Sequence, residues 1–278
     1  KEAPKRSRRS SGAMTLRDVA MLAGVAPITA SRAINTPNQV SPEVLRKVQE
    51  AVQRTGYVPN RMAGGLASAR SRLIAAVVPS TVVSVFMETI ESLNGTLFDA
   101  GYQLMLGQSG YSADREEVLL EAIIGRRPDG IFLTGILPPG KARTRLLASG
   151  IPVVETWDLT PTPIDMLIGF SHSDIGRSVA QFLLGKGYKK FAIVRAEDER
   201  ADRRTLAFQE TLSQRGLPAA FVANVGASRS LKSGREAMAR ILAEAPNVEA
   251  IFCSSDLLAL GVMTEARARN LTVPDDIA

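Results

Sequence analysis

The sequence contains only one cysteine, Cys253, and only one histidine, His172. A disulfide within the chain is therefore excluded, and neither a zinc site of His and Cys ligands nor a Cys–His catalytic pair is supported. We accordingly expect no metal and no cofactor. No apolar run reaches the about 18 residues of a membrane span, and no apolar segment follows the basic N-terminus as it would in a signal peptide. These absences favour a cytoplasmic protein that does not enter a membrane.

The sequence motifs of common enzymes are also missing. The chain has no glycine-rich dinucleotide or phosphate loop and no nucleophile elbow, and no nucleophile–base pair is visible. An enzyme is therefore not expected. Hydrophobic residues make up 45% of the 278 residues, which is enough for a sizeable core. At roughly 150 residues per domain, the length predicts about two domains.

The charge is distributed unevenly along the chain. Residues 1–72 carry 13 basic and 4 acidic side chains, whereas residues 73–278 carry 21 and 24. A basic segment joined to a mildly acidic body is typical of a polyanion-binding module attached to a second domain. Residues 1–13 are basic, serine-rich and nearly free of large apolar side chains, so we expect a disordered arm. This arm is either a solvated tail or an additional attraction for phosphates.

The pattern of residues 14–59 predicts three short helices. Apolar residues recur at helical spacing after Thr15, a residue type that caps helix N-termini, and Gly24 ends this first helix. Pro27 suits the first position of a second helix, and the hydroxyl of Ser41 suits the N-cap of a third. The order of a helix, a glycine turn and a short second helix is typical of a helix-turn-helix DNA-binding domain.

From residue 73 onward, apolar strand-like runs alternate with amphipathic helical stretches. This alternation predicts an α/β body of doubly wound parallel sheets joined by right-handed crossovers. A break with two prolines at 156–165 predicts a division into an N-lobe, 73–158, and a C-lobe, 159–278. On this division the strand-like run 166–170 opens the sheet of the C-lobe.

Two blocks of sequence closely resemble the DNA-binding headpiece of the lactose-repressor (LacI) family. They are residues 15–35 (TLRDVAMLAGVAPITASRAIN) and 40–68 (VSPEVLRKVQEAVQRTGYVPNRMAGGLAS). Segments of the body resemble the effector-binding core of the same family, which is periplasmic-binding-protein-like: 203–208 (RRTLAF), 252–262 (FCSSDLLALGV) and 271–278 (LTVPDDIA). Three further segments are most similar to the gluconate-utilisation repressors: 101–111, 150–158 and 164–174.

The resemblance implies a homodimeric transcription regulator that places its second helix in the major groove of double-stranded operator DNA. Arg32 is then the expected polar reader of base edges, since Pro27 and Ile28 offer only apolar contact. Residues expected to contact phosphates are Thr15, Thr29, Ser31 and Asn35. Two positions depart from the family pattern. Ala26 replaces the usual Ser or Thr N-cap, and Ala30 replaces the usual Val.

The resemblance also makes residues 60–72 a hinge helix and linker. Asn60, Arg61, Ala63 and Leu66 stand at the family's spacing, with Leu66 as the wedge that enters the minor groove. Gly64 and Gly65 each destabilise a helix by about 1 kcal/mol relative to Ala, so we expect this segment to be disordered without DNA and to fold on binding.

A small effector is implied between the two lobes, at the carboxyl ends of strands. Arg204 stands at the arginine of the family's R-x-x-G-F motif, here R-T-L-A-F, and an arginine fork suits the carboxylate of a sugar acid. The other residues expected at the effector are Phe86, Trp157, Asp158, Phe170, Ser255 and Asp256. Alternatives stay open: Arg203 as a solvated helix residue, Asp256 as a helix cap, and the aromatic residues as packing.

The resulting hypothesis is a repressor whose operator affinity is controlled by gluconate or a similar sugar acid. A response to another sugar or to a phosphorylated acid stays open, as does a sugar-binding protein without DNA-binding function. The sequence ends at Ala278, where the family continues with another strand, so we expect the C-terminal part of the core to be missing from the chain.

Overall fold

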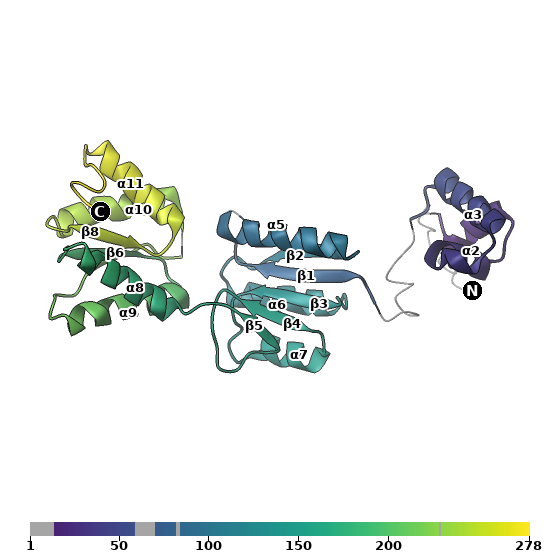
Figure 1. Ribbon diagram of the computed structural model, residues 1–278, viewed down its shortest axis with the longest axis horizontal. Coiled ribbons are helices and arrows are strands. Elements are labelled where there is room, and N and C mark those ends of the chain that lie inside the picture. The colour runs from purple at the N-terminus through teal and green to yellow at the C-terminus, as the bar shows by residue number, and fades with distance from the viewer. Residues whose placement is uncertain (1–13, 59–69, 82–83, 228) are drawn as a thin grey trace, which may run out of the picture. The chain divides into compact units, whose positions relative to one another are not determined.

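The computed structural model describes residues 14–58, 70–81, 84–227 and 229–278. The chain forms two compact units, residues 1–71 and 72–278 (Figure 1). The expected arm and most of the expected hinge lie outside the described residues. Within the described ranges, no helix combines the length and the apolar character that crossing a bilayer requires.

Unit 1 is a bundle of short helices. Its elements are α1 (Leu16–Ala23), α2 (Pro27–Asn35), the 3-10 turn η1 (Pro37–Gln39) and α3 (Pro42–Thr55). The Thr15 hydroxyl accepts a bond from the Asp18 amide, and the Asp18 side chain accepts from the Thr15 amide, which makes a capping box. Gly24 adopts the left-handed conformation, with φ of 67°, and Ser41 caps α3. The predicted helix starts and stops are therefore confirmed.

The core of unit 1 is small and built largely from alanine. Its buried residues are Val19, Ala20, Ala23, Ala30, Ala33, Val48 and Ala51. As expected, Ala26 provides no side-chain cap for α2. A missing hydroxyl cap typically lowers helix stability by about 1 kcal/mol, and Pro27 at the first helical position compensates in part by fixing φ.

The first sheet of unit 2 is parallel, with the strand order β2-β1-β3-β4-β5. Its strands are β1 (Leu73–Val78), β2 (Gln103–Gln108), β3 (Gly130–Thr134), β4 (Val153–Thr156) and β5 (Met166–Ile168). The helices between them are α5 (Ser84–Asp99), α6 (Ala113–Ile124) and α7 (Lys141–Ser149). Ile90 of α5 packs with Ala76 and Val78 of β1. Leu120 of α6 packs with the alternate residues of that strand, Ala75 and Val77, so the two helices cover opposite faces of the sheet. We call this sheet and its helices the first lobe.

The prediction that residues 166–170 open the second sheet is wrong. Strand β5 pairs with β4 in the first sheet, so the chain changes sheet after Ile168. The reason is a set of polar contacts that the sequence pattern does not show. The buried Glu155 carboxylate accepts a bond of 2.7 Å from the Ile164 amide, and the Asp165 carboxylate accepts one of 3.2 Å from the Val153 amide. These bonds hold the segment before β5 against β4.

The second sheet has the order β7-β6-β8 and is also parallel. Its strands are β6 (Phe191–Arg195), β7 (Phe221–Asn224) and β8 (Ala250–Cys253). Four helices flank it: α8 (His172–Gly185), α9 (Glu199–Gln214), α10 (Leu231–Glu244) and α11 (Asp256–Ala268). Helices α8 and α9 cover one face and α10 and α11 the other (Figure 1). We call this part the second lobe. The α/β class with doubly wound parallel sheets is confirmed.

Helices α8 and α9 approach closely at Gly176. A Cβ atom at this position would lie 2.1 Å from the carbonyl oxygen of Arg204 on α9. We expect Gly176→Ala to lower the free energy of unfolding of unit 2 by about 1–3 kcal/mol, because overpacking forces the helices apart. The matched control is Gly185→Ala in the same helix, where a Cβ would meet nothing within 4 Å. Thermal melts that show equal stability for the two variants would contradict this packing argument.

Candidate functional site

Helix α2 presents the residues expected to read DNA on the surface of unit 1. Pro27, Ile28 and Arg32 are exposed, and Ile28 keeps 61% of its surface accessible. Thr29 and Ser31 are half-buried. Ala30 and Ala33 point into the core, so helical periodicity places the reading residues on the opposite side. The helix therefore has the two-faced character that insertion into a major groove requires.

Two of the residues expected at phosphates already make local hydrogen bonds. The Thr15 hydroxyl donates to the Asp18 carboxylate at 2.7 Å, and the Asn35 amide donates to the Ser31 carbonyl at 3.0 Å. Both side chains are exposed, so each bond fixes a side chain at the surface. The hinge residues Asn60, Arg61, Ala63 and Leu66 lie outside the described residues.

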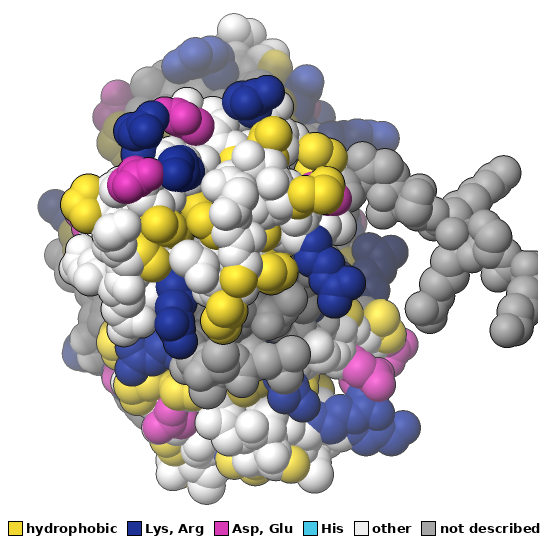
Figure 2. Space-filling model, turned by 90° about the vertical axis from the view of Figure 1, so that its right-hand side faces the viewer, with side chains coloured by type: hydrophobic (Ala, Val, Ile, Leu, Met, Phe, Trp, Pro, Cys, Tyr) yellow, Lys and Arg dark blue, Asp and Glu magenta, His cyan; other side chains and the backbone are white. Residues whose placement is uncertain are grey.

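The acidic side chains within residues 14–58 are engaged by neighbours. Glu43 pairs with Lys47 and Glu50 with Arg46, each at 2.7 Å, and Asp18 belongs to the capping box. The Lys47 ammonium lowers the pKa of Glu43. Three basic residues make no ion pair within 14–58: Arg17, Arg32 and Arg54. The face shown in Figure 2 carries basic side chains interspersed with exposed hydrophobic ones. Arg17, Arg32 and Arg54 are therefore available to contact phosphates or base edges.

Four rings form a row in unit 2. The ring centroids of Phe86 and Trp157 lie 5.2 Å apart, those of Trp157 and Phe170 5.6 Å, and those of Phe170 and His172 5.2 Å. All three pairs meet edge to face. Trp157 follows β4 directly and has a positive φ of 65°, an uncommon conformation for a bulky side chain. The structure thus brings together the three aromatic residues expected at the effector.

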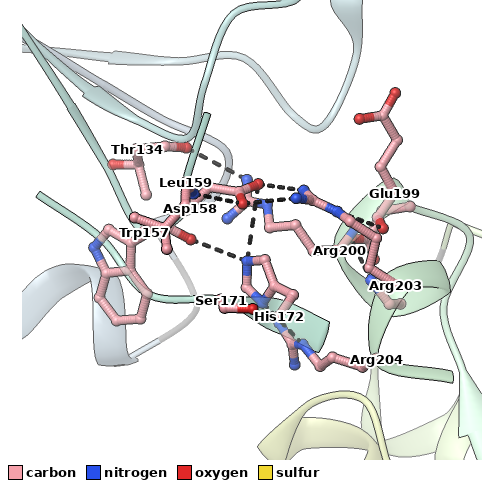
Figure 3. A network of polar contacts seen from close by, with 12 residues as sticks. Thr134, Trp157, Asp158, Leu159, Ser171, His172, Glu199, Arg200, Arg203 and Arg204 are labelled. Atoms are coloured by element: carbon pink, nitrogen blue, oxygen red, sulfur yellow. Dashed lines mark hydrogen bonds and ion pairs between the residues drawn. The ribbon is translucent and has the colours of Figure 1, made fainter. Parts of the chain in front are cut away.

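The prediction of a solvated Arg203 is wrong. Asp158 is only 2% exposed, and its carboxylate receives both terminal nitrogens of Arg203, with Nη1 at 2.8 Å from Oδ1 (Figure 3). Such a fork-to-fork pair is the strongest geometry available to these groups. It joins the end of β4 in the first lobe to α9 in the second. Both oxygens of Asp158, expected at the effector, are occupied by this pair.

His172 connects the same two lobes and is held neutral. Its Nε2 donates to the Trp157 carbonyl at 3.0 Å, and its Nδ1 accepts a bond of 3.1 Å from Nε of Arg204. An Nδ1 that accepts carries no proton, so the ring is the neutral Nε2-protonated tautomer. Burial of the ring, followed by the nearby Arg204 charge, lowers the His172 pKa to about 4.

The depressed pKa predicts that stability falls in mild acid. The unfolded chain protonates His172 near the ordinary value of 6.5, whereas the folded chain does so near 4. Protons therefore favour the unfolded state between these values, and about 3 kcal/mol of stability is lost as the pH falls through this window. The matched variant His172→Gln lacks this titration. Identical pH dependence of unfolding for both proteins would refute the assignment.

Arg204 has one nitrogen left for a ligand. Its Nη1 donates to the Ser254 carbonyl at 2.9 Å, while Nη2 makes no hydrogen bond to any described residue. The hydroxyl of Ser255, the next residue along the chain from Ser254, is buried and has no partner within the described residues. Asp256 is exposed and opens α11, and the N-cap position belongs to Ser255 instead. Arg204 therefore offers one guanidinium nitrogen, and Ser255 a hydroxyl, that have no partner among the described residues.

Sequence reasoning missed most of this interlobe network. Arg200 donates to the Thr134 carbonyl at 3.4 Å, so α9 contacts the first lobe through Arg200 as well as Arg203. The available signal was spacing. Positions 200, 203 and 204 are i, i+3 and i+4, so their side chains lie on one face of the helix. Three arginines on one face indicate common partners, whereas a helix exposed to solvent has no need of this arrangement.

Comparison with known proteins decides the family. Residues 15–60 match the family described as bacterial regulatory proteins, lacI family. Residues 71–278 match the periplasmic binding proteins and sugar binding domain of the LacI family. The chain belongs to the LacI family. It is accordingly a transcription regulator with a helix-turn-helix DNA-binding domain and a sugar-binding-type core.

Individual LacI-family relatives agree with this conclusion. The transcriptional regulator GntR of Pseudomonas aeruginosa is 36% identical over 273 residues, which cover 97% of this chain and 79% of the relative. A LacI-family regulator from Silicibacter pomeroyi has a solved structure with a TM-score of 0.88 at 33% identity, covering 95% of this chain and 80% of that one. The lac repressor dimer bound to operator shares the fold, with a TM-score of 0.77 at 24% identity, covering 96% of this chain and 81% of that one.

Proposed function

We propose that this LacI-family regulator acts in the cytoplasm as a homodimeric repressor and releases its operator when a six-carbon sugar acid, gluconate or a close analogue, binds between its lobes. The observation that carries the proposal is Arg204, whose Nη2 makes no hydrogen bond to a described residue and whose Nη1 donates to the carbonyl of Ser254, the residue before Ser255 with its partnerless hydroxyl. A sugar acid supplies a carboxylate for the first group and hydroxyls for the second. The likeness to GntR supports this choice of effector class.

The interlobe network gives the effector a means of control. Arg203 and His172 both join the first lobe to the second, so the separation of the lobes is set by polar contacts that a ligand can extend or replace. An effector that favours one lobe arrangement by its differential affinity shifts operator binding, typically by about 1–3 kcal/mol of coupling. Residues 59–69 connect this core to α3, and we propose that they carry the change to the DNA.

The proposal includes no catalytic step. The relatives are transcription regulators, and the network of Asp158, His172 and Arg204 contains a neutral histidine whose two nitrogens are both occupied. Such a ring is not available to activate a nucleophile. Conversion of gluconate by the purified protein would contradict this part of the proposal.

Fluorescence of the only tryptophan provides the test. Trp157 lies between Phe86 and Phe170 and accepts a bond from His172 at its carbonyl, so a ligand at Arg204 is expected to change its environment. Titration with gluconate should give a saturable change, while glucose, which lacks the carboxylate, should not. Equal responses to gluconate and glucose would argue against a carboxylate held by Arg204. Absence of binding by calorimetry would remove gluconate as the effector.

A further inference from the structure

His172 fixes the orientation of the Arg204 guanidinium. Nε of Arg204 donates to Nδ1 of His172 at 3.1 Å, and Nη1 donates to the Ser254 carbonyl at 2.9 Å. A guanidinium is planar, so bonds at two of its nitrogens determine its plane and the direction of the third, Nη2. Ser254 contributes only a backbone atom. Among the residues that the structure describes, His172 is therefore the one side chain that hydrogen-bonds to the Arg204 fork.

The ring that holds Arg204 is itself held by the first lobe. Its Nε2 donates to the Trp157 carbonyl at 3.0 Å, just after β4, and the Phe170 ring packs against it edge to face at 5.2 Å. His172 is only 2% exposed. Figure 3 shows the ring between the Trp157 carbonyl and the Arg204 side chain. Two hydrogen bonds through one imidazole thus connect the backbone of the first lobe to an arginine of the second.

Only one protonation form of the ring can make both bonds. The neutral form with its proton on Nε2 donates to the Trp157 carbonyl and accepts from Nε of Arg204. The other neutral tautomer, with its proton on Nδ1, would bring two donors together at Arg204 and two acceptors together at Trp157. The doubly protonated ring would keep the bond to Trp157 and lose the bond to Arg204, because both ring nitrogens then donate. The protonation form of the ring therefore decides whether Arg204 is held.

The charged groups around the ring favour the form that holds Arg204. From the segment after β4, Oδ2 of Asp158 lies 3.9 Å from Nε2 and favours a doubly protonated ring. Both oxygens of that carboxylate are already bound by Arg203. From α9, the charges of Arg204 and Arg200 disfavour a second proton on the ring, and burial of the ring disfavours it most. The pair of Asp158 and Arg203 thus helps to keep His172 neutral.

We propose that His172 is a positioning residue for the effector site, and that its Nε2-protonated form couples the position of the first lobe to the orientation of Arg204. This inference rests on the proposed function, in which Arg204 binds the effector. Separation of the lobes breaks the bond at Nε2, removes the partner that favours this tautomer, and thereby releases Arg204. Because coupled equilibria are reciprocal, a ligand that needs Arg204 in its held orientation favours the joined lobes.

Nitrogen NMR of the untagged wild-type chain, labelled at histidine, tests the inference without any ligand. His172 is the only histidine, so the spectrum reports one imidazole. At neutral pH we expect the proton on Nε2, in slow exchange with water because it is buried against the Trp157 carbonyl. Arg204→Met removes the cation bonded to the ring, so its ring should accept a second proton at a higher pH than the wild-type ring does. A wild-type ring with its proton on Nδ1, or the same titration in both proteins, would overturn the inference.

Two variants at one position separate positioning from packing. His172→Gln retains a donor and an acceptor but not the shape of the ring, whereas His172→Phe retains the shape and neither function. Calorimetric titration of the full chain with gluconate should show an affinity loss of about 10-fold or more for His172→Phe, the effect of a lost bond to a charged group. The loss for His172→Gln should be smaller. Melting curves must show that both variants are folded, and the NMR comparison requires neither of them.

The outcomes distinguish this inference from the proposed function. A folded His172→Phe protein that binds gluconate as tightly as His172→Gln, or more tightly, would show that only the packing of the ring matters, and would overturn the inference alone. Failure of the wild type to bind gluconate would contradict the proposed function, and the NMR spectra would still decide whether His172 holds Arg204.

Discussion

Arg32→Met is expected to weaken binding to the cognate operator by about 10- to 100-fold, which corresponds to the roughly 1–3 kcal/mol of one bidentate contact to a base. Arg32 is exposed on α2 and makes no ion pair within residues 14–58, so its guanidinium is free to reach a guanine edge. Its neighbours on the same helix cannot substitute for it, because Pro27 has no N–H and the side chain of Ile28 has only apolar atoms. Methionine retains much of the length and removes the charge and the donors.

The control for this prediction is Arg54→Met on α3. It removes the same charge from unit 1, away from the reading helix, at another arginine without an ion pair in that range. Fluorescence anisotropy with operator and with scrambled DNA should show a loss of specificity for Arg32→Met only. The slope of log binding constant against log salt concentration should fall by about 1 in each variant whose arginine contacts a phosphate or a base. Equal losses on both DNAs for Arg32→Met would show that Arg32 binds phosphate rather than bases.

Arg204→Met is expected to weaken gluconate binding by about 10- to 150-fold, the range for a hydrogen bond to a charged group. Operator binding without gluconate should stay unchanged, because Arg204 lies in unit 2 whereas the residues that read DNA lie in unit 1. The variant therefore separates control from DNA binding: it should repress and fail to release. Arg204→Lys, which keeps a charge but lacks the fork, should recover only part of the affinity.

A matched control exists on the neighbouring helix. Arg177 on α8 is half-exposed and pairs with Asp174 in the same helix, so Arg177→Met removes a charge without reaching the interlobe network. It should respond to gluconate like the wild type. Because Arg204 also holds His172 and the Ser254 carbonyl, melting curves must show that Arg204→Met is folded. A folded Arg204→Met protein that binds gluconate normally would exclude Arg204 from the effector site.

Local signals in the sequence were sufficient for the secondary structure. Thr15, Gly24 and Ser41 act through hydrogen bonds and backbone conformations within their own segment, so their effects can be recognised without knowledge of the fold. The same holds for the alternation of apolar runs with amphipathic stretches, because a parallel strand that is buried on both faces has a continuous apolar run in its own sequence. Phe86, Trp157 and Phe170, each expected at the effector, lie together in the structure, although the sequence pattern had placed residues 166–170 in the other sheet.

Contacts between distant segments were not predictable in this way. The pair of Asp158 and Arg203 joins positions 45 residues apart, and either side chain alone is typical of a solvated surface. Strand β5 was placed in the wrong sheet because its three residues carry no periodicity, and its partner is chosen by the bonds of Glu155 and Asp165. In each case the arrangement is stabilised by hydrogen bonds and ion pairs between polar groups that are distant in the sequence and close only in the folded structure.

The most direct test of the account is operator release by the wild-type regulator. Fluorescence anisotropy of a labelled operator, at fixed salt and with the protein just saturating, should fall as gluconate is added and should not fall with equal concentrations of glucose. The midpoint should move to higher gluconate in Arg204→Met, in parallel with the loss of gluconate affinity. An operator complex that survives saturating gluconate, once calorimetry shows that the ligand is bound, would contradict control of DNA binding by a sugar acid.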